Sequence, residues 1–209
     1  MKQVGIIGFG PLGKQLFNML IEDEWKEENI FIFDDNIKVD NKHLFRFNEY
    51  NRFKDNLEFI ITLGYHNLKI KNEIIKELLH NNYILFSFIH KNAYVHPLAK
   101  VGKSVIIFPG SIIEQNAQIM DGGICYDSTI VAHDCVIYKA VFIAPSVTIC
   151  GYTSIGEESF IGAGTIVGNN LNVGKNVKIG MASAVQKDIN DDICALGNPL
   201  KIVKNLELI

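Results

Sequence analysis

The chain has 209 residues, of which 48% are hydrophobic and 21% are charged, and its formal net charge is −3. This composition is typical of a globular protein with one or two hydrophobic cores. The basic residues form no stripe along the sequence, which argues against a nucleic-acid-binding protein. Glycine and proline interrupt the first apolar run, so we expect neither a signal peptide nor a membrane span. We therefore expect a cytoplasmic location.

Strand and helix patterns alternate over the first ninety residues. Short apolar runs predict strands at 4–9, Ile30–Phe33, 57–63 and 83–89. Amphipathic patterns predict one helix with Leu12, Leu16, Met19 and Leu20 on one face and a second helix over 67–79. This alternation predicts a small α/β, Rossmann-like domain over residues 1–90, about half the size of a complete dinucleotide-binding domain.

A glycine-rich turn joins the first predicted strand to the first predicted helix. Gly8, Gly10 and Gly13 follow the spacing G-x-G-x-x-G, and Asp34 and Asp35 end the next strand about twenty residues later. Such glycines let a diphosphate approach the backbone at a helix N-terminus, and a carboxylate can bind a ribose hydroxyl. The motif therefore predicts nucleotide binding. The alternative is a purely structural turn between strand and helix that binds no ligand. The missing second mononucleotide half disfavours a nicotinamide-dependent dehydrogenase.

From residue 95 onward the sequence repeats with a period of six. Isoleucine or valine recurs at every sixth position, and only Cys125 interrupts the series Val95, Val101, Ile107, Ile113, Ile119, Val131, Ile137, Ile143, Ile149, Ile155, Ile161, Val167, Val173, Ile179 and Val185. A fixed period predicts a solenoid, in which each repeat buries its apolar face against the next. With three hexads per triangular coil, residues 91–209 are predicted to form a parallel β-helix of roughly five coils with a C-terminal tail.

Two other positions of the hexad are restricted in size. The residue two places before the inward residue is small in most hexads, because it must fit beside the inward side chain: Ala93, Ala99, Ser111, Ala117, Gly123, Thr129, Thr153, Ser159, Thr165 and Ser183. Glycine follows several inward residues directly, at Gly102, Gly156, Gly162, Gly168, Gly174 and Gly180. We expect these glycines to ease the backbone at the corners of the coil.

The four cysteines show no pair at metal-binding or redox spacing. Cys125 occupies an inward position and Cys135 a small-residue position, so we interpret both as buried thiols. No chemistry is assigned to Cys150 or Cys194.

His133 is the candidate catalytic residue of the repeat region. It lies two residues after the inward Val131, at a corner or on the outer face, and Asp134 follows it. A solvent-accessible histidine can act as a general base near neutral pH, although an isolated surface histidine is usually inert. A zinc enzyme related to the γ-carbonic anhydrases needs three histidine ligands, whereas this region offers only His96 and His133, so no metal site is expected.

These features together resemble one known family. A small α/β domain, hexapeptide repeats, His133-Asp134 within the repeats and the C-terminal segment Leu-Gly-Asn-Pro-Leu-Lys at 196–201 are similar to the nucleotide-amino-sugar N-acetyltransferases. These proteins are related to the bacillosamine-pathway and sialic-acid acetyltransferases, and the resemblance covers the entire chain. It implies a cytoplasmic homotrimer with a left-handed β-helix, which transfers an acetyl group from the cosubstrate acetyl-CoA to a nucleotide-linked amino sugar in polysaccharide biosynthesis.

The resemblance also implies roles for individual residues. His133 corresponds to the general base, Asp134 to the residue that orients it, and Gly151 to the residue whose amide holds the thioester carbonyl. Acetyl-CoA is implied to lie between two prisms, with contacts at positions matching Phe142, Ala163, Met181, Gly197, Pro199 and Lys201. The implied contacts of the nucleotide sugar are Gly8, Gly10, Leu12, Gly13, Asp34, Asp35, Gly64 and Tyr126.

Three features depart from the family's pattern. Leu12 replaces a histidine that often precedes the last glycine of the turn. Tyr126 and Phe142 replace an asparagine and a histidine, and Leu200 replaces the alanine of Gly-x-Pro-Ala. A sugar O-acetyltransferase of the sialic-acid type and a non-catalytic homologue that binds nucleotide sugars are therefore kept as alternatives.

Overall fold

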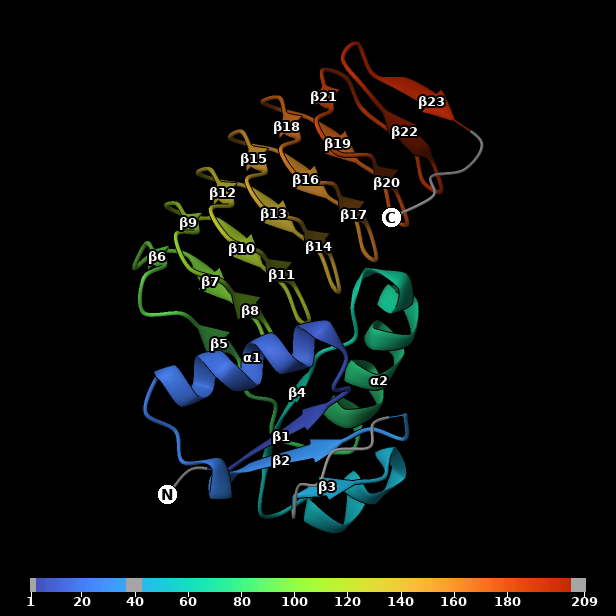
Figure 1. Cartoon of the computed structure of the whole chain (residues 1–209). Coiled ribbons are helices and arrows are strands. Elements are labelled where there is room, and N and C mark those ends of the chain that lie inside the picture. The colour runs from blue at the N-terminus through green and yellow to red at the C-terminus, as the bar shows by residue number, and fades with distance from the viewer. Residues whose placement is uncertain (1–2, 37–42, 204–209) are drawn as a thin grey trace. The chain divides into compact units, whose positions relative to one another are not determined.

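The structure is a computed structural model that describes residues 3–36 and 43–203. These residues form two compact units, divided between Ser87 and Phe88. The first unit is an α/β fold and the second is a β-solenoid (Figure 1). In the described part of the chain, no helix is long and apolar enough to span a membrane.

A parallel sheet with the strand order β3-β2-β1-β4 forms the centre of the first unit. Its strands are β1 (Val4–Ile7), β2 (Ile30–Phe33), β3 (Leu44–Phe45) and β4 (Glu58–Ile61), with the helices α1 (Pro11–Glu22) and α2 (Leu68–His80) and the 3₁₀ turns η1 (Glu27–Asn29), η2 (Phe47–Phe53) and η3 (Tyr65–Asn67). Val4 of β1 pairs with Ile30 on one side and with Glu58 on the other. The carboxyl ends of β1 and β4 therefore form a topological switch point, where open α/β sheets bind ligands.

The first unit confirms the expected parallel sheet and corrects one predicted strand. The strand expected over 83–89 is wrong, because Leu85 forms only an isolated bridge with Phe59, whereas β5 (Phe88–Ile89) pairs with a strand of the solenoid. The sequence shows one continuous apolar run here, although its two halves join two different sheets. The short edge strand β3 was not predicted.

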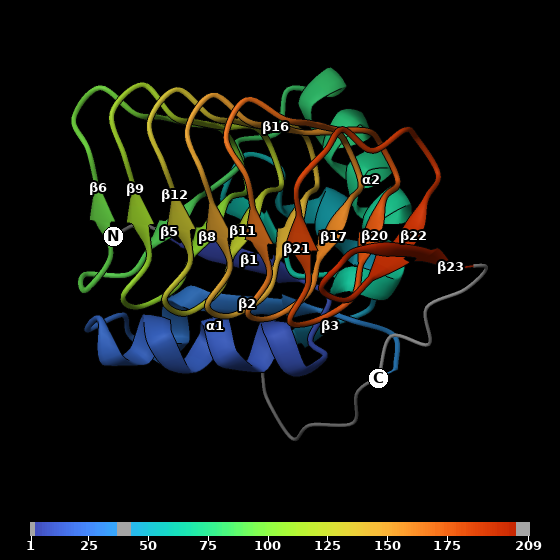
Figure 2. The ribbon, with the colours of Figure 1, turned by 90° about the horizontal axis from the view of Figure 1, so that it is seen from above.

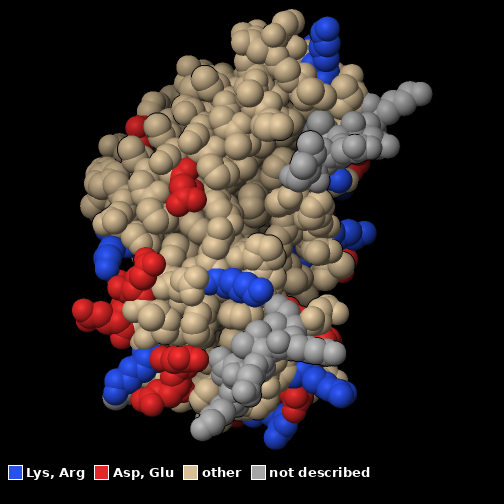
Figure 3. Space-filling model, viewed as in Figure 1, with Lys and Arg blue, Asp and Glu red and all other residues tan. Residues whose placement is uncertain are grey.

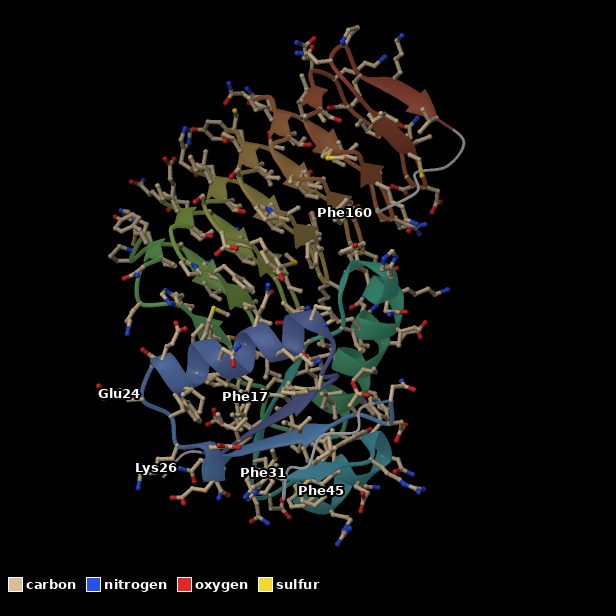
Figure 4. The ribbon with its side chains drawn as sticks, in the orientation of Figure 1. Phe17, Glu24, Lys26, Phe31, Phe45 and Phe160 are labelled. Atoms are coloured by element: carbon tan, nitrogen blue, oxygen red, sulfur yellow. The ribbon has the colours of Figure 1, made fainter. Side chains whose placement is uncertain are left out.

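Aromatic packing explains how β3 is held at the sheet edge. The rings of Phe31 and Phe45 stack with centroids 6.1 Å apart (Figure 4), and Phe53 of η2 contacts them at 5.6 and 4.8 Å. Aromatic pairs in such geometries contribute about 0.5–1.5 kcal/mol each beyond the burial of their area. Ring packing thus supports a strand that has only two residues.

The second unit is a left-handed-type β-solenoid of about six turns, whose coils contribute short strands to three sheets (Figure 2). One sheet contains β5, β8 (Ile106–Ile107), β11 (Ile124–Cys125), β14 (Phe142–Ile143), β17 (Phe160–Ile161), β20 (Lys178–Ile179), β22 (Cys194–Leu196) and the antiparallel β23 (Lys201–Val203). The six-stranded sheet contains β6 (Tyr94–Val95), β9 (Ile112–Ile113), β12 (Ile130–Val131), β15 (Thr148–Ile149), β18 (Ile166–Val167) and β21 (Ala184–Val185). The five-stranded sheet contains β7 (Lys100–Val101), β10 (Gln118–Ile119), β13 (Val136–Ile137), β16 (Ser154–Ile155) and β19 (Asn172–Val173).

The aliphatic series forms the core of the solenoid, as the hexad predicts. From Ile107 to Val185 every inward residue, Cys125 included, is at most 2% exposed. Burial of one such side chain contributes about 1.5–3 kcal/mol. The solenoid is longer than the roughly five coils that the hexad predicts, because β22 pairs with β20 at an offset of sixteen residues instead of eighteen. The last coil therefore continues after the six-residue period has ended.

The small residues beside the core also form hydrogen bonds between coils. The hydroxyl groups of Ser111, Thr153 and Ser159 donate to the carbonyl oxygens of Tyr126, Gly168 and Gly174 at 2.7–2.9 Å. Each partner lies fifteen residues further along the chain. Buried hydroxyl groups need such partners, because an unpaired one costs roughly 1–3 kcal/mol. Serine and threonine at this hexad position therefore provide hydrogen bonds as well as small size.

The glycines after the inward residues have a different purpose from the one predicted. The left-handed backbone conformation occurs two residues later in the hexad, at every sixth residue from Ser104 to Ala182, with φ between 51° and 74°. A Cβ atom at Gly102, Gly156 or Gly174 would instead lie 2.5–2.7 Å from backbone atoms of the next coil. These glycines permit the close approach of two coils and do not form the corners.

Gly156→Ala should therefore destabilise the protein much more than Gly168→Ala. A Cβ at Gly156 meets the backbone of Gly174 and Lys175 at 2.5 Å, whereas at Gly168 the nearest atom is 3.3 Å away. Overpacking of this kind costs about 1–3 kcal/mol, and urea denaturation of both variants measures it. Equal losses would contradict the role assigned to Gly156.

Candidate active site

His133 and Asp134 lie at the corner of the coil that follows β12. His133 Nδ1 is 3.0 Å from Asp134 Oδ2. A carboxylate can only accept, so the Nδ1–H group donates and Nε2 keeps an available lone pair. The His133 side chain is 48% exposed. The arrangement thus gives an oriented imidazole whose second nitrogen can accept a proton.

Gly151 lies at the same corner, one coil after His133. A Cβ atom at Gly151 would be 2.8 Å from both Cε1 and Nε2 of His133, so the imidazole ring packs on a position where a side chain does not fit. The amides of Cys150 and Tyr152 donate to Val167 and His133, whereas the Gly151 N–H donates to no other described residue. An available backbone amide beside the His133 imidazole is a donor that can stabilise an oxyanion.

A surface hollow of about 470 Å³ surrounds the imidazole, lined by Tyr94, His96, Glu114, Gln115, His133, Asp134 and Tyr152. The ring of Tyr152 stands edge-on to His133, with centroids 5.1 Å apart, and is 61% exposed. Tyr152 also has a left-handed φ of 60°. Bulky residues rarely adopt this conformation, so an aromatic residue at this corner position is a signal of a special site. The sequence analysis did not single out Tyr152.

Two residues of the preceding coil hold the His133–Asp134 pair. Glu114 Oε2 accepts a hydrogen bond from the His133 backbone N–H at 2.9 Å. Asn116 Nδ2 donates to Asp134 Oδ1 at 3.0 Å. The hydrogen bonds from His133 and Asn116 hold the pKa of Asp134 below its ordinary value, so the carboxylate stays charged near neutral pH. No sequence motif indicated either partner.

The cysteine predictions are confirmed for the two buried thiols. Cys125 and Cys135 are 0% exposed. Burial raises the pKa of Cys125 to about 12 and that of Cys135 to about 11. Both thiols are therefore protonated near neutral pH and are poor nucleophiles.

Tyr126 and Phe142 belong to an aromatic stack along the eight-stranded sheet. Tyr126 stacks on Phe108 at 4.0 Å and lies 5.4 Å from Phe142, which in turn lies 5.7 Å from Phe160. Phe142 is 5% exposed. Within one chain these residues lie on another side of the triangular coil from His133. Their expected ligand contacts stay predictions.

The other residues expected to contact acetyl-CoA lie nearer the C-terminal end of the solenoid. Ala163 and Met181 lie in consecutive coils, where the Ala182 amide donates to the Ala163 oxygen at 2.8 Å, and Met181 is 67% exposed.

Gly197 accepts from the Ala184 amide at 3.1 Å and donates to Ser183 Oγ at 2.9 Å. Pro199 follows in the turn between β22 and β23, and Lys201 begins β23.

The backbone of the N-terminal turn requires glycine at two of its three glycine positions, Gly8 and Gly13, but not at Gly10. Gly8 has a φ of 88°, and a Cβ atom at Gly13 would collide with the Gly8 oxygen. No atom lies within 4 Å of a Cβ atom built at Gly10, and the same holds for Gly64, after β4. Folding alone therefore does not require glycine at Gly10 or Gly64. Both positions lie at the switch point, where a ligand approaches the backbone.

The acidic residues after β2 support the turn directly. Asp34 accepts hydrogen bonds from the amides of Phe9 at 2.6 Å and Asn36 at 2.7 Å, so it ties the glycine turn to the end of β2. Asp35 accepts from the Phe47 amide at 3.1 Å. Leu12 is 5% exposed and belongs to the buried face of α1. A hollow of about 710 Å³ beside these carboxylates is lined by Asp34, Asp35, Leu44, Phe45, Arg46, Asn48 and Glu49.

Charge and metal-ligand patterns add little to this site. Lys and Arg side chains form no continuous stripe on the face shown in Figure 3. Among residues 3–36 and 43–203, no group of three or more His, Cys, Asp or Glu side chains could hold a metal ion.

The chain is similar to solved acetyltransferase structures over almost its whole length. No family model matches it. The acetyltransferase domain of PglB from Neisseria gonorrhoeae, solved with acetyl coenzyme A, is 26% identical with a TM-score of 0.89, covering 97% of this chain and 99% of that one. PerB from Caulobacter crescentus, solved with CoA and GDP-perosamine, is 24% identical with a TM-score of 0.88 and 97% and 98% coverage. WeeI from Acinetobacter baumannii is 20% identical with a TM-score of 0.85 and 97% and 100% coverage. The chain has the architecture of the hexapeptide-repeat sugar acetyltransferases.

His133→Ala should raise the pKa of Asp134 toward its ordinary value. The hydrogen bond from His133 is the largest cause of the lowered pKa, because it stabilises the charged carboxylate. The contribution of the pair to stability is therefore present above the ordinary pKa of aspartate and is lost as the pH falls through the lowered value. Carboxyl ¹³C NMR titration measures the shift, with His80→Ala as a control that should leave Asp134 unchanged. An unaltered Asp134 titration in His133→Ala would contradict the pairing.

Proposed function

We propose that this chain is an acetyl-CoA-dependent N-acetyltransferase that acts on the amino group of a nucleotide-linked amino sugar. The observation that carries the proposal is the His133 ring, oriented by Asp134 and packed on Gly151 with its available amide. The acetyltransferase domain of PglB, which has the same fold, binds acetyl coenzyme A. PerB, which also shares the fold, binds CoA together with GDP-perosamine, and this motivates a nucleotide sugar as the acceptor.

The site supplies a base and an oxyanion donor for acyl transfer. His133 Nε2 accepts the proton that the amine loses as its nitrogen bonds to the thioester carbonyl carbon. The Gly151 amide donates to the carbonyl oxygen, which becomes negative in the tetrahedral intermediate. The protonated His133 then supplies a proton to the sulfur atom as the carbon–sulfur bond breaks. A general base contributes roughly 10²–10⁴-fold to the rate, and an oxyanion donor about 3 kcal/mol.

The first unit is proposed to bind the nucleotide as a Rossmann-like domain. Gly10 and Gly64 leave open space at the switch point between β1 and β4. The N-cap of α1 at Gly10 has no side-chain hydrogen bond, so the first amides of the helix can face a diphosphate. Asp34 holds this turn in place, while Asp35 borders the neighbouring hollow and can accept from a ribose hydroxyl.

Free-thiol release from acetyl-CoA tests the reaction class. The assay uses UDP-, dTDP- and GDP-linked amino sugars and matching sugars that carry a hydroxyl in place of the amine. We expect thiol release with at least one amino sugar and not with its hydroxyl analogue. Release only with hydroxyl sugars would indicate an O-acetyltransferase, and binding without release would indicate a non-catalytic protein.

His133→Ala should lower kcat by roughly 10²–10⁴-fold, the usual contribution of a general base. His133 lies outside the aliphatic core and its side chain is 48% exposed, so the variant should fold like the wild type. Steady-state kinetics with the accepted amino sugar measures the loss, and circular dichroism checks the fold. Wild-type kcat in a folded variant would rule out His133 as the base.

Gly10→Val should raise the KM for the nucleotide sugar strongly and leave the affinity for acetyl-CoA nearly unchanged. The added side chain meets no protein atom within 4 Å at its Cβ, so it should block the approach of a phosphate without disturbing the fold. Calorimetry with each ligand separately measures both affinities. Equal losses for the two ligands would refute the separate binding roles of the two units.

The uncharged outer face of the six-stranded sheet supports the further proposal that the chain forms a homotrimer. Its outward residues carry no charge: Tyr94, Ile112, Ile130, Thr148, Ile166 and Ala184. Among them Tyr94 is 54% and Ile166 is 55% exposed. Parallel sheets are usually covered on both faces, and a ring of three copies can cover one such face on each copy.

Ile166→Lys should therefore dissociate the homotrimer, because a lysine would be buried in the interface. Gln118→Lys is the matched control, because Gln118 is the first residue of β10 in the five-stranded sheet and should leave the trimer intact. Sedimentation velocity measures the mass of each variant. A wild-type chain that sediments as an active monomer would contradict the proposal.

A further inference from the structure

We propose that Asn116 and Glu114 are positioning residues that hold the His133–Asp134 pair in its reactive geometry. This inference rests on the proposed role of His133 as the base. Neither residue needs to contact the substrate for this role. Each acts through a hydrogen bond to one member of the pair.

Asn116 fixes the carboxylate of Asp134. It lies eighteen residues earlier, at the same corner of the preceding coil, and donates to Oδ1 at 3.0 Å. The other carboxylate oxygen, Oδ2, is the one that contacts His133 Nδ1. The two oxygens are therefore held by two different donors, and the carboxylate cannot rotate without losing one of them. The orientation of the imidazole thus depends on Asn116 through Asp134.

Glu114 fixes the backbone of the same pair. Its Oε2 atom accepts from the His133 N–H at 2.9 Å, while its own N–H donates to the Val131 oxygen in the coil that carries His133. The chain direction at His133 and the carboxylate at Asp134 are therefore both tied to one neighbouring coil.

The solenoid contains a second asparagine–aspartate pair that lacks the histidine. Asn176 Nδ2 donates to Asp192 Oδ1 at 2.8 Å, and all four residues of the two pairs have a left-handed φ of 51–60°. The contact therefore serves as a link between coils in both places. At Asn116 this link also orients the His133 imidazole through Asp134. The Asn176–Asp192 pair therefore serves as an internal control for the structural effect of the link alone.

The test compares Asn116→Ala with Asn176→Ala. Alanine already occupies the same left-handed corner position at Ala140 and Ala182, both with a φ of 53°, so the corner accepts alanine and its backbone cost should be similar in the two variants. Both variants should show similar small decreases in Tm. Only Asn116→Ala should lower kcat, by about 10- to 100-fold, the range seen when a hydrogen-bond partner that orients a metal-ligating side chain is removed. The KM values of both substrates should stay unchanged.

Two conservative variants separate hydrogen bonding from packing. Asn116→Asp keeps the size of the side chain but places a carboxylate against that of Asp134, so kcat should fall at least as much as in Asn116→Ala. Glu114→Gln keeps an oxygen that can accept from the His133 N–H and should retain most of the activity, whereas Glu114→Ala should lose it. Equal kcat in Asn116→Ala and Asn176→Ala would overturn the proposal, as would wild-type kcat in Asn116→Asp.

The tautomer of His133 gives a readout that does not require turnover. Long-range ¹H–¹⁵N NMR of the imidazole should show the Nδ1-protonated form in the wild type and in Asn176→Ala, and a mixture of both tautomers in Asn116→Ala. An unchanged tautomer in Asn116→Ala would overturn the proposal. A wild-type protein that transfers acetyl to no acceptor would refute the proposed function instead, and the NMR result would still decide whether Asn116 positions His133.

Discussion

Parallel strand pairing, in which each residue lies opposite the one eighteen positions further along, holds each regular coil in register with the next, as between β12 and β15. The inward aliphatic residues stack on one another in this register and exclude water, so no coil can shift without exposing its core. Residues from successive coils therefore meet in fixed columns along each corner. The proposed base at His133 and the amide at Gly151 are neighbours in one such column, and their geometry follows from the register of the whole solenoid.

The corners of the coil provide backbone amides that the strand ladder does not use. Amides within the strands are used by the ladder, whereas the amide two residues after an inward position lies outside it. At His133 the Glu114 side chain binds this amide, and at Gly151 it donates to no other described residue. The left-handed residue that follows directs a side chain back toward the same corner, as Asp134 does toward His133. A scaffold that is uniform in its core can thus carry a reactive site at one corner.

The sequence predicts the core of this protein better than its corners. The inward residues, Cys125 included, follow from the six-residue period, because burial depends on which side chains face inward. The left-handed positions and the close approach at Gly156 depend on backbone geometry that many residue types allow, so the glycine pattern indicated the wrong cause. His133 and Asp134 were identified as adjacent residues. Glu114 and Asn116 were not, because contacts across a coil depend on side-chain direction and leave no periodic signal.

The central claim is that His133 and Gly151 act on one bond-forming centre, and a crystal structure of the complex with CoA and a nucleotide-linked amino sugar measures this directly. The account predicts the sugar amine within about 2.6–3.2 Å of His133 Nε2, the distance at which a general base takes a proton. The CoA sulfur should lie in the same hollow, beside the Gly151 amide. An amine bound away from His133, or a CoA sulfur at a different corner of the solenoid, would contradict the account.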